Sequence, residues 1–177
     1  MTLEQVAPFS MVVALQVAEA LKEVNALDCE VKWPNDIMVN GKKVAGILLG
    51  TTSKFRKPWV LIGIGINVNN EIPAEIARVA TSIAAIRKQS QGRSRLLEAV
   101  LAKLNTAWID FGRTGFGPYQ KAVEGRLQGV GKQVQVKVGS KTLNGKLKSV
   151  DAQGNLVLDS AAGLKTVPAG EIVGQPA

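Results

Sequence analysis

The stretch Lys32-Trp33-Pro34-Asn35-Asp36, followed by Lys42-Lys43-Val44-Ala45-Gly46-Ile47-Leu48, decides how the middle of this chain folds. Between the two runs, Asn40-Gly41 is a strong signal for a tight β-hairpin turn. Lys43 is therefore expected near the start of a strand, just after the hairpin tip, with Asp36 on the opposite arm. The sequence thus predicts an ammonium and a carboxylate that can address one ligand.

Composition limits the kinds of chemistry open to the protein. The chain has 177 residues, 46% of them hydrophobic and 20% charged, which suits one sizeable core with a small second domain. It contains no His and a single cysteine, Cys29. An internal disulfide, His or Cys metal ligation, and Cys/His or Ser/His catalysis are therefore excluded. Any catalysis depends on Lys, Arg, Asp, Asn and backbone amides.

Charge and hydropathy argue against nucleic acid and membrane as partners. The formal net charge is +8, but residues 1–119 and residues 120–177 each carry half of the excess. An excess spread so evenly is more typical of solvated surface than of a nucleic-acid footprint. No apolar run approaches the roughly 20 residues that span a bilayer, and the N-terminus does not resemble a secretory signal. We expect a cytoplasmic protein that binds neither membrane nor DNA.

The first part of the chain alternates between helical and strand patterns. Apolar residues recur at helical spacing over residues 11–24 and again from Arg95 to Phe111, where Gly112, Gly115 and Gly117-Pro118 end the pattern. A short helix and a surface loop are expected over residues 82–94. The predicted strands are residues 29–33, 36–39, 43–50 and 58–67, with a further turn around Lys54–Pro58.

Beyond Gly125 the pattern changes to short alternating strands separated by glycine-containing turns. Strands are predicted at residues 133–138, 143–150, 155–158 and 164–168. Turns are predicted at residues 139–140, 144–145, 151–155 and 161–163. Short, evenly spaced strands indicate a small barrel. The expected domains are residues 1–125 and 126–177.

Glycines create a bare strand face in the run Ile62-Gly63-Ile64-Gly65-Ile66-Asn67. On one strand, Gly63, Gly65 and Asn67 would share a face that has almost no side chains. Glycine inside a strand marks close approach by a ligand or by another backbone. Gly46 would extend this bare face from the neighbouring strand. Strict alternation places Gly46 and Lys43 on opposite faces, so a bulge or the strand start is needed to bring them together.

These motifs together resemble the biotin protein ligase family. The match covers the KWPND run, the K-x-AGIL run, the G-x-G-x-N strand and the C-terminal stretch from about Gly129. The resemblance implies an α+β fold: a class II synthetase-like catalytic domain with a mixed sheet and helices, lacking its N-terminal part, and then a small SH3-like β-barrel. It also implies formation of biotinyl-5′-AMP from biotin and ATP with Mg²⁺, and transfer of biotin to a lysine of a carrier protein.

The resemblance assigns roles to particular residues. Lys43 would bridge the ligand carboxylate and the α-phosphate, and Asp36 would orient the incoming amine, although Pro-Asn-Asp is also a good turn sequence. Arg126, near the domain junction, is a candidate nucleotide contact. Lys42 is expected to be an ordinary surface lysine. The remaining residues implied for biotin or adenylate binding are Gly46, Leu48, Gly63, Gly65, Asn67, Trp33 and Asn35, although Trp33 also suits the core and Asn35 a turn.

The sequence departs from the family at its beginning. The family's Gly/Arg-rich adenylate loop, G-R-G-x-x-G-R, is not found in this sequence. The chain alone is therefore expected to be weakly active or inactive, and an open sheet edge is expected to favour a homodimer. The alternatives are a catalytically dead ligase remnant or binding module, one half of a split ligase, and a lipoate–protein ligase.

Overall fold

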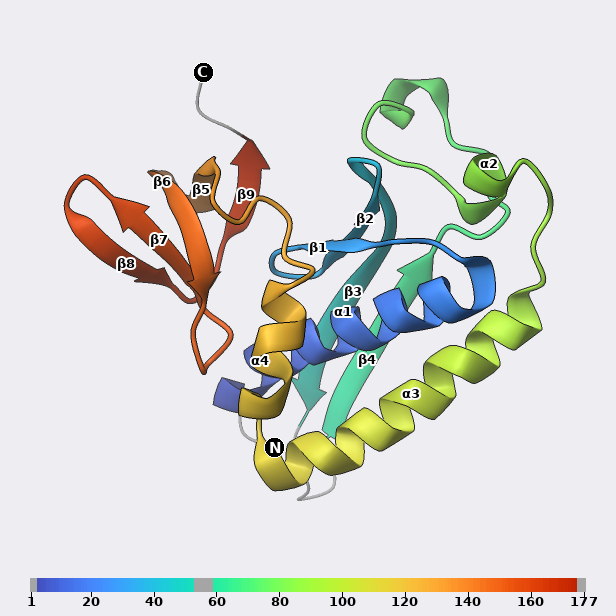
Figure 1. The fold of residues 1–177 in the computed structure, drawn as a ribbon, viewed down its shortest axis with the longest axis horizontal. Coiled ribbons are helices and arrows are strands. Elements are labelled where there is room, and N and C mark those ends of the chain that lie inside the picture. The colour runs from blue at the N-terminus through green and yellow to red at the C-terminus, as the bar shows by residue number, and fades with distance from the viewer. Residues whose placement is uncertain (1–2, 53–58, 175–177) are drawn as a thin grey trace.

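The molecule consists of two β-sheets joined by helices, as Figure 1 shows for this computed structural model. The structure describes residues 3–52 and 59–174, with side chains from residue 8 onward. The turn predicted around Lys54–Pro58 lies outside the described residues. A four-stranded sheet with α1 and α3 on one face forms the larger lobe, and a five-stranded sheet forms the other. The α+β class predicted from the sequence is confirmed.

The first sheet has the strand order β1-β2-β3-β4, and each neighbouring pair is antiparallel. Its strands are β1 (Glu30–Lys32), β2 (Asp36–Val39), β3 (Lys42–Thr52) and β4 (Trp59–Ile66). Asn40 and Gly41 both have positive φ at the β2–β3 tip, as a two-residue hairpin requires. Within the described residues, the mixed character expected of this sheet is limited to two isolated parallel bridges.

Helix α1 (Leu3–Asn25) forms the centre of the core. It begins earlier than the sequence predicted, with Pro8 inside it. It packs against α3 (Arg93–Thr114) and against β3. Phe9 joins the two helices, because its ring lies 5.4 Å from that of Trp108 and 4.9 Å from that of Phe111. Helix α1 therefore covers one face of the first sheet, and the bare glycine face is the opposite one.

Three short helical segments connect these parts. They are the 3₁₀ helix η2 (Ala74–Ile76), α2 (Ile83–Arg87) and α4 (Gly117–Glu124). The sequence pattern did not predict α4, because Gly117-Pro118 was interpreted only as the end of the preceding helix. Pro118 instead lies in the first turn of α4, where its missing N–H costs no hydrogen bond. No helix in the described part of the chain is both long and apolar enough to cross a bilayer.

The second sheet has the strand order β8-β7-β6-β5-β9, with antiparallel pairs throughout. Its strands are β5 (Gln133–Val138), β6 (Lys141–Val150), β7 (Leu156–Ser160), β8 (Gly163–Val167) and β9 (Glu171–Gly174). The sequence pattern missed β9. Among the described residues no ladder joins β8 to β9, so these strands form an open sheet, and closure of the predicted barrel is not seen.

The turn predicted at Asn144-Gly145 is wrong, because both residues lie inside β6. Gly145 is needed there for a different reason. A Cβ at this position would lie 3.0 Å from the Asp159 carbonyl oxygen and 3.1 Å from Leu158 Cβ. The glycine therefore permits close approach of β6 and β7.

The two edges of the first sheet differ. Along β1, the Val31 N–H donates to the Arg126 carbonyl at 2.7 Å, and the Gln128 N–H donates to the Val31 carbonyl at 2.9 Å. Residues 126–128, which belong to the linker between the two sheets, therefore cover this edge. At the other edge, β4 has no strand partner beyond β3 within the described residues. An apolar groove of about 950 Å³ lies between β4 and α3.

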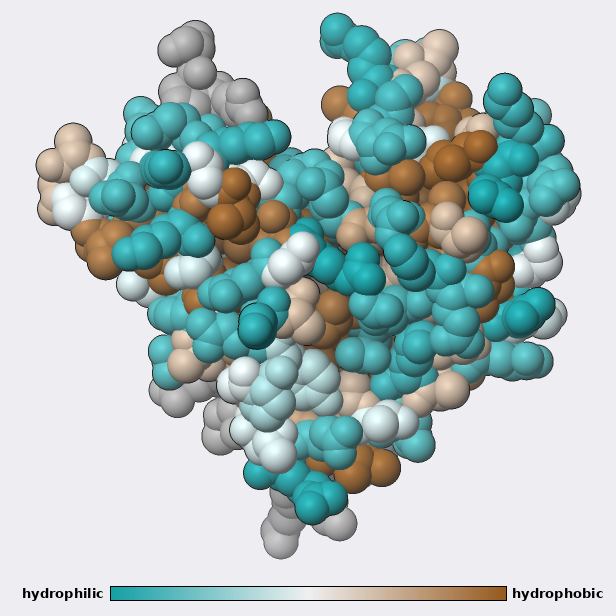
Figure 2. Space-filling model, in the orientation of Figure 1, coloured by the Kyte–Doolittle hydropathy of each residue, from teal (hydrophilic) through white to brown (hydrophobic). Residues whose placement is uncertain are grey.

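The surface seen in Figure 2 is mostly hydrophilic along α3. Hydrophobic side chains gather over the C-terminal sheet and near α2 on this face. Leu164 on β8 is 61% exposed, and Val79, near η2, is 63% exposed. Exposed apolar side chains scattered in this way are common and mark no site by themselves.

Candidate functional site

A β-bulge in the β2–β3 hairpin determines which side chains meet. Asp36 is opposite Gly46, whereas Met38 is opposite Lys43, so Val44 is an extra residue in β3. The extra residue turns Lys43 to the face that carries Gly46 and Asp36. This resolves the conflict that strict alternation created for Lys43 and Gly46. Bulges commonly redirect a side chain beside a functional site.

Lys43 and Asp36 form an ion pair on this face. Lys43 Nζ lies 2.6 Å from Asp36 Oδ1, and the two side chains are 45% and 20% exposed. The lysine stem lies across Gly46, where an added Cβ would be 2.9 Å from Lys43 Cε and 3.0 Å from its Nζ. Glycine at position 46 therefore leaves the room that the ammonium needs to reach the carboxylate.

The bare strand face extends from this ion pair across β3 and β4. Gly46 pairs with Gly65, and Leu48 pairs with Gly63. A cavity of about 490 Å³ lies over this face. Its lining includes Asn35, Asp36, Lys43, Gly46, Leu48, Gly63 and Gly65. Most residues that the sequence singled out for a ligand therefore surround one cavity.

A second cavity of about 620 Å³ lies between the hairpin and the C-terminal sheet. Charged residues line it, including Lys32 on β1, Glu171 on β9 and Lys132 just before β5. Lys32 Nζ and Glu171 Oε1 are 3.9 Å apart. Asp36 and Lys43 line both cavities, so the ion pair lies at their junction and can be reached from two sides.

The segment after η2 supports the bulge, a role that no sequence motif predicted. The Lys43 N–H donates to the Val79 carbonyl at 2.8 Å, and the Thr81 N–H donates to the Lys43 carbonyl at 2.9 Å. Lys42 Nζ donates to the Ala77 carbonyl at 2.6 Å. Lys42 was expected to be an ordinary surface lysine, and this interpretation is wrong, because its ammonium holds the supporting segment.

Three predicted ligand residues also make contacts within the fold. Asn35 Nδ2 donates to the Ile47 carbonyl at 2.8 Å and stays in the lining of the glycine-face cavity. Asn67 Nδ2 donates to the Thr81 carbonyl at 3.2 Å, and Asn67 is absent from that lining. Trp33 is 2% exposed and donates its indole N–H to the Gly154 carbonyl at 3.2 Å. Trp33 and Asn67 thus hold neighbouring segments and do not border the cavity.

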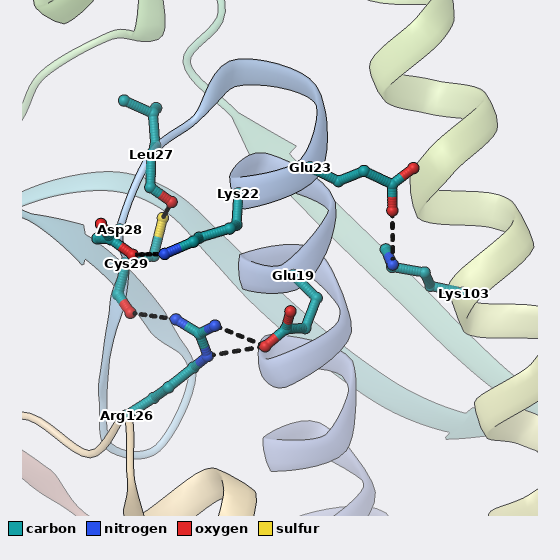
Figure 3. A network of polar contacts seen from close by, with 8 residues as sticks. All are labelled: Glu19, Lys22, Glu23, Leu27, Asp28, Cys29, Lys103 and Arg126. Carbon is teal, nitrogen blue, oxygen red and sulfur yellow. Dashed lines mark hydrogen bonds and ion pairs between the residues drawn. The ribbon is translucent and has the colours of Figure 1, made fainter.

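Arg126 lies in a polar network between the linker and α1, shown in Figure 3. Its Nε and Nη2 donate to Glu19 Oε1 at 3.0 and 2.5 Å, and its Nη1 donates to the Cys29 carbonyl at 3.1 Å. Arg126 lines neither the glycine-face cavity nor the cavity between the two sheets. The structure therefore places this guanidinium in a structural contact outside both cavities, and its contact with a nucleotide stays a prediction.

The same network shows how burial and ion pairs affect titratable groups. Burial raises the pKa of the Cys29 thiol to about 11, so the thiol is neutral. Hydrogen bonds from Lys22 to Asp28 and from Lys103 to Glu23 lower the pKa of each carboxyl group. No group of three His, Cys, Asp or Glu residues that could hold a metal ion occurs in the part of the chain that the structure describes.

Comparison with known proteins identifies the class of this fold and site. The Biotin/lipoate A/B protein ligase family matches residues 2–69, and the Biotin protein ligase C terminal domain matches residues 129–173. The crystal structure of biotin protein ligase from Aquifex aeolicus aligns with a TM-score of 0.88 and 30% identity, over 99% of this chain and 77% of that chain. The same enzyme in complex with biotin and ATP aligns equally well, with a TM-score of 0.88 and 29% identity.

Sequence relatives identify the same family. The biotin–[acetyl-CoA-carboxylase] ligase of Paracoccus denitrificans is 30% identical, over 94% of this chain and 72% of that protein. The bifunctional ligase/repressor BirA of Bacillus subtilis is 30% identical over 96% of this chain. The chain spans about half of that longer relative, 54% of its length. This chain belongs to the biotin protein ligase family.

Proposed function

We propose that this chain carries the adenylate site of a biotin protein ligase, which joins biotin to a lysine of a carrier protein at the expense of ATP. The observation that carries the proposal is the Lys43–Asp36 ion pair, which lies over Gly46 at the end of a bare glycine face. A cation next to a face without side chains suits a ligand that has both a flat body and a phosphate. Biotinyl-5′-AMP is such a ligand.

The first step would activate biotin. A carboxylate oxygen of biotin attacks the α-phosphorus of ATP, the bond to the β-phosphate oxygen breaks, and pyrophosphate leaves with its Mg²⁺. Lys43 supplies positive charge to the biotin carboxylate and to the α-phosphate oxygens, where negative charge builds up. Its flexible stem lets the ammonium follow that charge from one group to the other. Mg²⁺ enters with the nucleotide as part of the substrate.

The second step would transfer biotin to the acceptor lysine. The amine nitrogen attacks the acyl carbonyl carbon, the bond to the phosphate oxygen breaks, and AMP leaves. Asp36 lies beside Lys43 and lines both cavities, so its carboxylate can orient an incoming amine and accept its proton. We propose a biotin-accepting carrier domain of a carboxylase as the partner and the cytoplasm as the location of the reaction.

The glycine face would hold the body of the adenylate. Gly63 and Gly65 leave the strand surface open, and Asn35 is held at its border by its bond to Ile47. Leu48 is 75% exposed at this face, so an apolar ligand would cover it. The match to the C-terminal domain of biotin protein ligases favours biotin over lipoate as the acid.

Catalysis by this chain alone is expected to be weak. The cavity over the glycine face is open, and the Gly/Arg-rich loop of the family, which would exclude water and supply Arg donors, is not in this sequence. Incubation with labelled biotin, ATP and an acceptor domain measures the activity. Turnover equal to that of a full-length ligase would contradict this expectation.

A homodimer through the open edge of the first sheet is part of the proposal. Within the described residues β4 pairs with no strand other than β3, and Leu61 on this strand is 60% exposed. A second copy of the chain can pair with this edge through its own β4.

Binding of a non-hydrolysable biotinyl-adenylate analogue, measured by calorimetry, tests the site. Lys43→Ala removes a charge-assisted contact worth about 2–4 kcal/mol, which corresponds to a loss of affinity of roughly 30- to 900-fold. Lys148→Ala is the matched control, because Lys148 is an exposed lysine on β6. Lys42→Ala is a poor control, since its ammonium holds the Ala77 carbonyl. Equal effects of Lys43→Ala and Lys148→Ala would disprove the proposed site.

A further inference from the structure

A turn of the C-terminal sheet contacts the loop that carries Asn35 and Asp36. The Trp33 indole N–H reaches across to the Gly154 carbonyl, in the turn between β6 and β7, at 3.2 Å. Trp33 is 2% exposed, so this hydrogen bond is shielded from water. A buried N–H without an acceptor is costly, and the bond therefore couples the two segments strongly.

The turn is built rigidly by one acidic residue. Asp151 Oδ1 accepts hydrogen bonds from the backbone N–H groups of Gln153 and Asn155, both at 2.9 Å, and its Oδ2 accepts from Asn155 Nδ2 at 2.9 Å. The Gly154 N–H donates to the Asp151 carbonyl at 2.9 Å. The carboxylate thus closes the turn and fixes the direction of the Gly154 carbonyl.

Gly154 is also fixed by its neighbour on α1. Its φ is +73°, and an added Cβ would lie 2.8 Å from Pro8 Cα. The turn is therefore held between the C-terminal sheet and the first helix, and the Gly154 carbonyl has little freedom to move. A shift of this carbonyl would move the Trp33 side chain that is bonded to it. Two peptide bonds then join Trp33 to Asn35.

We infer that the Asp151–Asn155 turn acts as a positioning element for the candidate active site, with Trp33 as the positioning residue that connects them. The inference rests on the proposed function. Through Trp33, the turn sets where Asn35 meets the Ile47 carbonyl and where β2 begins at Asp36, the partner of Lys43. An error of about 1 Å in such an arrangement can reduce efficiency by about 100-fold, so support at a distance matters.

The test uses variants that alter the coupling without touching the cavity. Trp33→Phe keeps an aromatic ring but removes the indole donor. Asp151→Ala opens the turn, and Asp151→Asn restores one of its acceptor oxygens. Asp159→Ala is the matched control, because Asp159 is an exposed acid on β7 with no bond to the turn.

Two measurements are made on the complete chain. The first is the resonance of the Asn35 side-chain amide in the ligand-free protein, recorded by ¹H–¹⁵N NMR. The second is affinity for the non-hydrolysable biotinyl-adenylate analogue. We expect Trp33→Phe and Asp151→Ala each to shift the Asn35 resonance and to lower affinity about tenfold. Asp151→Asn should recover part of both effects, and Asp159→Ala should cause neither.

The two proposals fail in different ways. If the wild-type chain does not bind the analogue, the proposed function is wrong, and the ligand-free spectra still decide whether the turn positions Asn35. If the wild-type chain binds, but Trp33→Phe and Asp151→Ala leave either the Asn35 resonance or the affinity unchanged, the positioning role is overturned. A single path through Trp33 predicts that the double variant binds no more weakly than the weaker single variant, and a double effect as large as the product of the two single effects would overturn that path.

Discussion

Gly46 is the residue that makes the Lys43–Asp36 arrangement sterically possible. Gly46→Ala adds a methyl group 2.9 Å from Lys43 Cε, near the far end of a flexible side chain. The lysine can move aside, so the free energy of unfolding should change little while the ammonium leaves Asp36. We expect affinity for the adenylate analogue to fall at least tenfold, the effect of losing about 1.4 kcal/mol.

Gly50→Ala provides the control on the same strand. Gly50 lies on β3, and nothing lies within 4 Å of an added Cβ there. Calorimetry should therefore show no change in affinity, and urea unfolding should show no loss of stability. If Gly46→Ala binds the analogue as tightly as Gly50→Ala does, the position of Lys43 over Gly46 is not important for the site.

Cys29 provides a prediction about pH at the same scale. The thiol is 4% exposed, and burial raises its pKa from 9.0 to about 11. The unfolded chain therefore loses this proton before the folded chain does, and the free energy of unfolding should fall as pH rises from 9 to 11. Cys29→Ser has no thiol to titrate, so urea midpoints between pH 8 and 10.5 should fall less in this variant. Identical slopes in the two proteins would contradict the prediction.

At the scale of elements, glycines in β6 and α3 should respond oppositely to the same change. Gly145→Ala places a Cβ 3.0 Å from the Asp159 carbonyl and should destabilise the protein by about 1–3 kcal/mol. Gly112→Ala lies inside α3 with nothing within 4 Å of the added Cβ. It should stabilise the protein by about 0.5–1 kcal/mol, because alanine favours a helix interior. Urea midpoints measure both, and a stabilising Gly145→Ala would show that β6 and β7 can separate.

The sequence predicted elements better than it predicted their irregularities. Asn40-Gly41 and the alternating run at residues 133–138 each carry a local signal, and both elements were predicted correctly. The conflict between Lys43 and Gly46 showed that a bulge or the strand start was needed, but the sequence did not locate the bulge at Val44, because one extra residue in a strand changes register without changing composition. Asn144-Gly145 carries a turn signal, yet packing against β7 uses the glycine inside a strand.

The candidate site shows the same division between local and long-range information. Lys43, Asp36 and the strand glycines could be chosen from motifs, because their side chains, or the lack of them, suggest the chemistry directly. Asn67 and Arg126 could not be placed in this way. Their partners, the Thr81 carbonyl and Glu19, are distant in sequence, so nothing local indicates that these polar groups are used within the fold.

At the scale of the whole molecule, the open β4 edge predicts concentration-dependent association. Sedimentation velocity at increasing concentration should show a monomer converting to a dimer. Leu61→Lys places a charge on the edge strand and should shift the equilibrium toward monomer. Leu164→Lys changes an equally exposed residue on β8, an edge strand of the other sheet, and should leave association unchanged. A monomer at all concentrations, or dissociation by Leu164→Lys alone, would contradict pairing through β4.

The linker that pairs with Val31 has a consequence for how large such an assembly can grow. It occupies the β1 side of the first sheet, which leaves one side of this sheet, the β4 side, without a partner among the described residues. Two copies that join through their free sides form a closed pair related by a two-fold axis, and neither copy offers this sheet to a third. A sheet free on both sides could instead add copies without limit and produce fibres. In a dimer paired through β4, residues 126–128 would keep a third copy from adding at β1, and disrupting their pairing with β1 should turn that dimer into an aggregating chain.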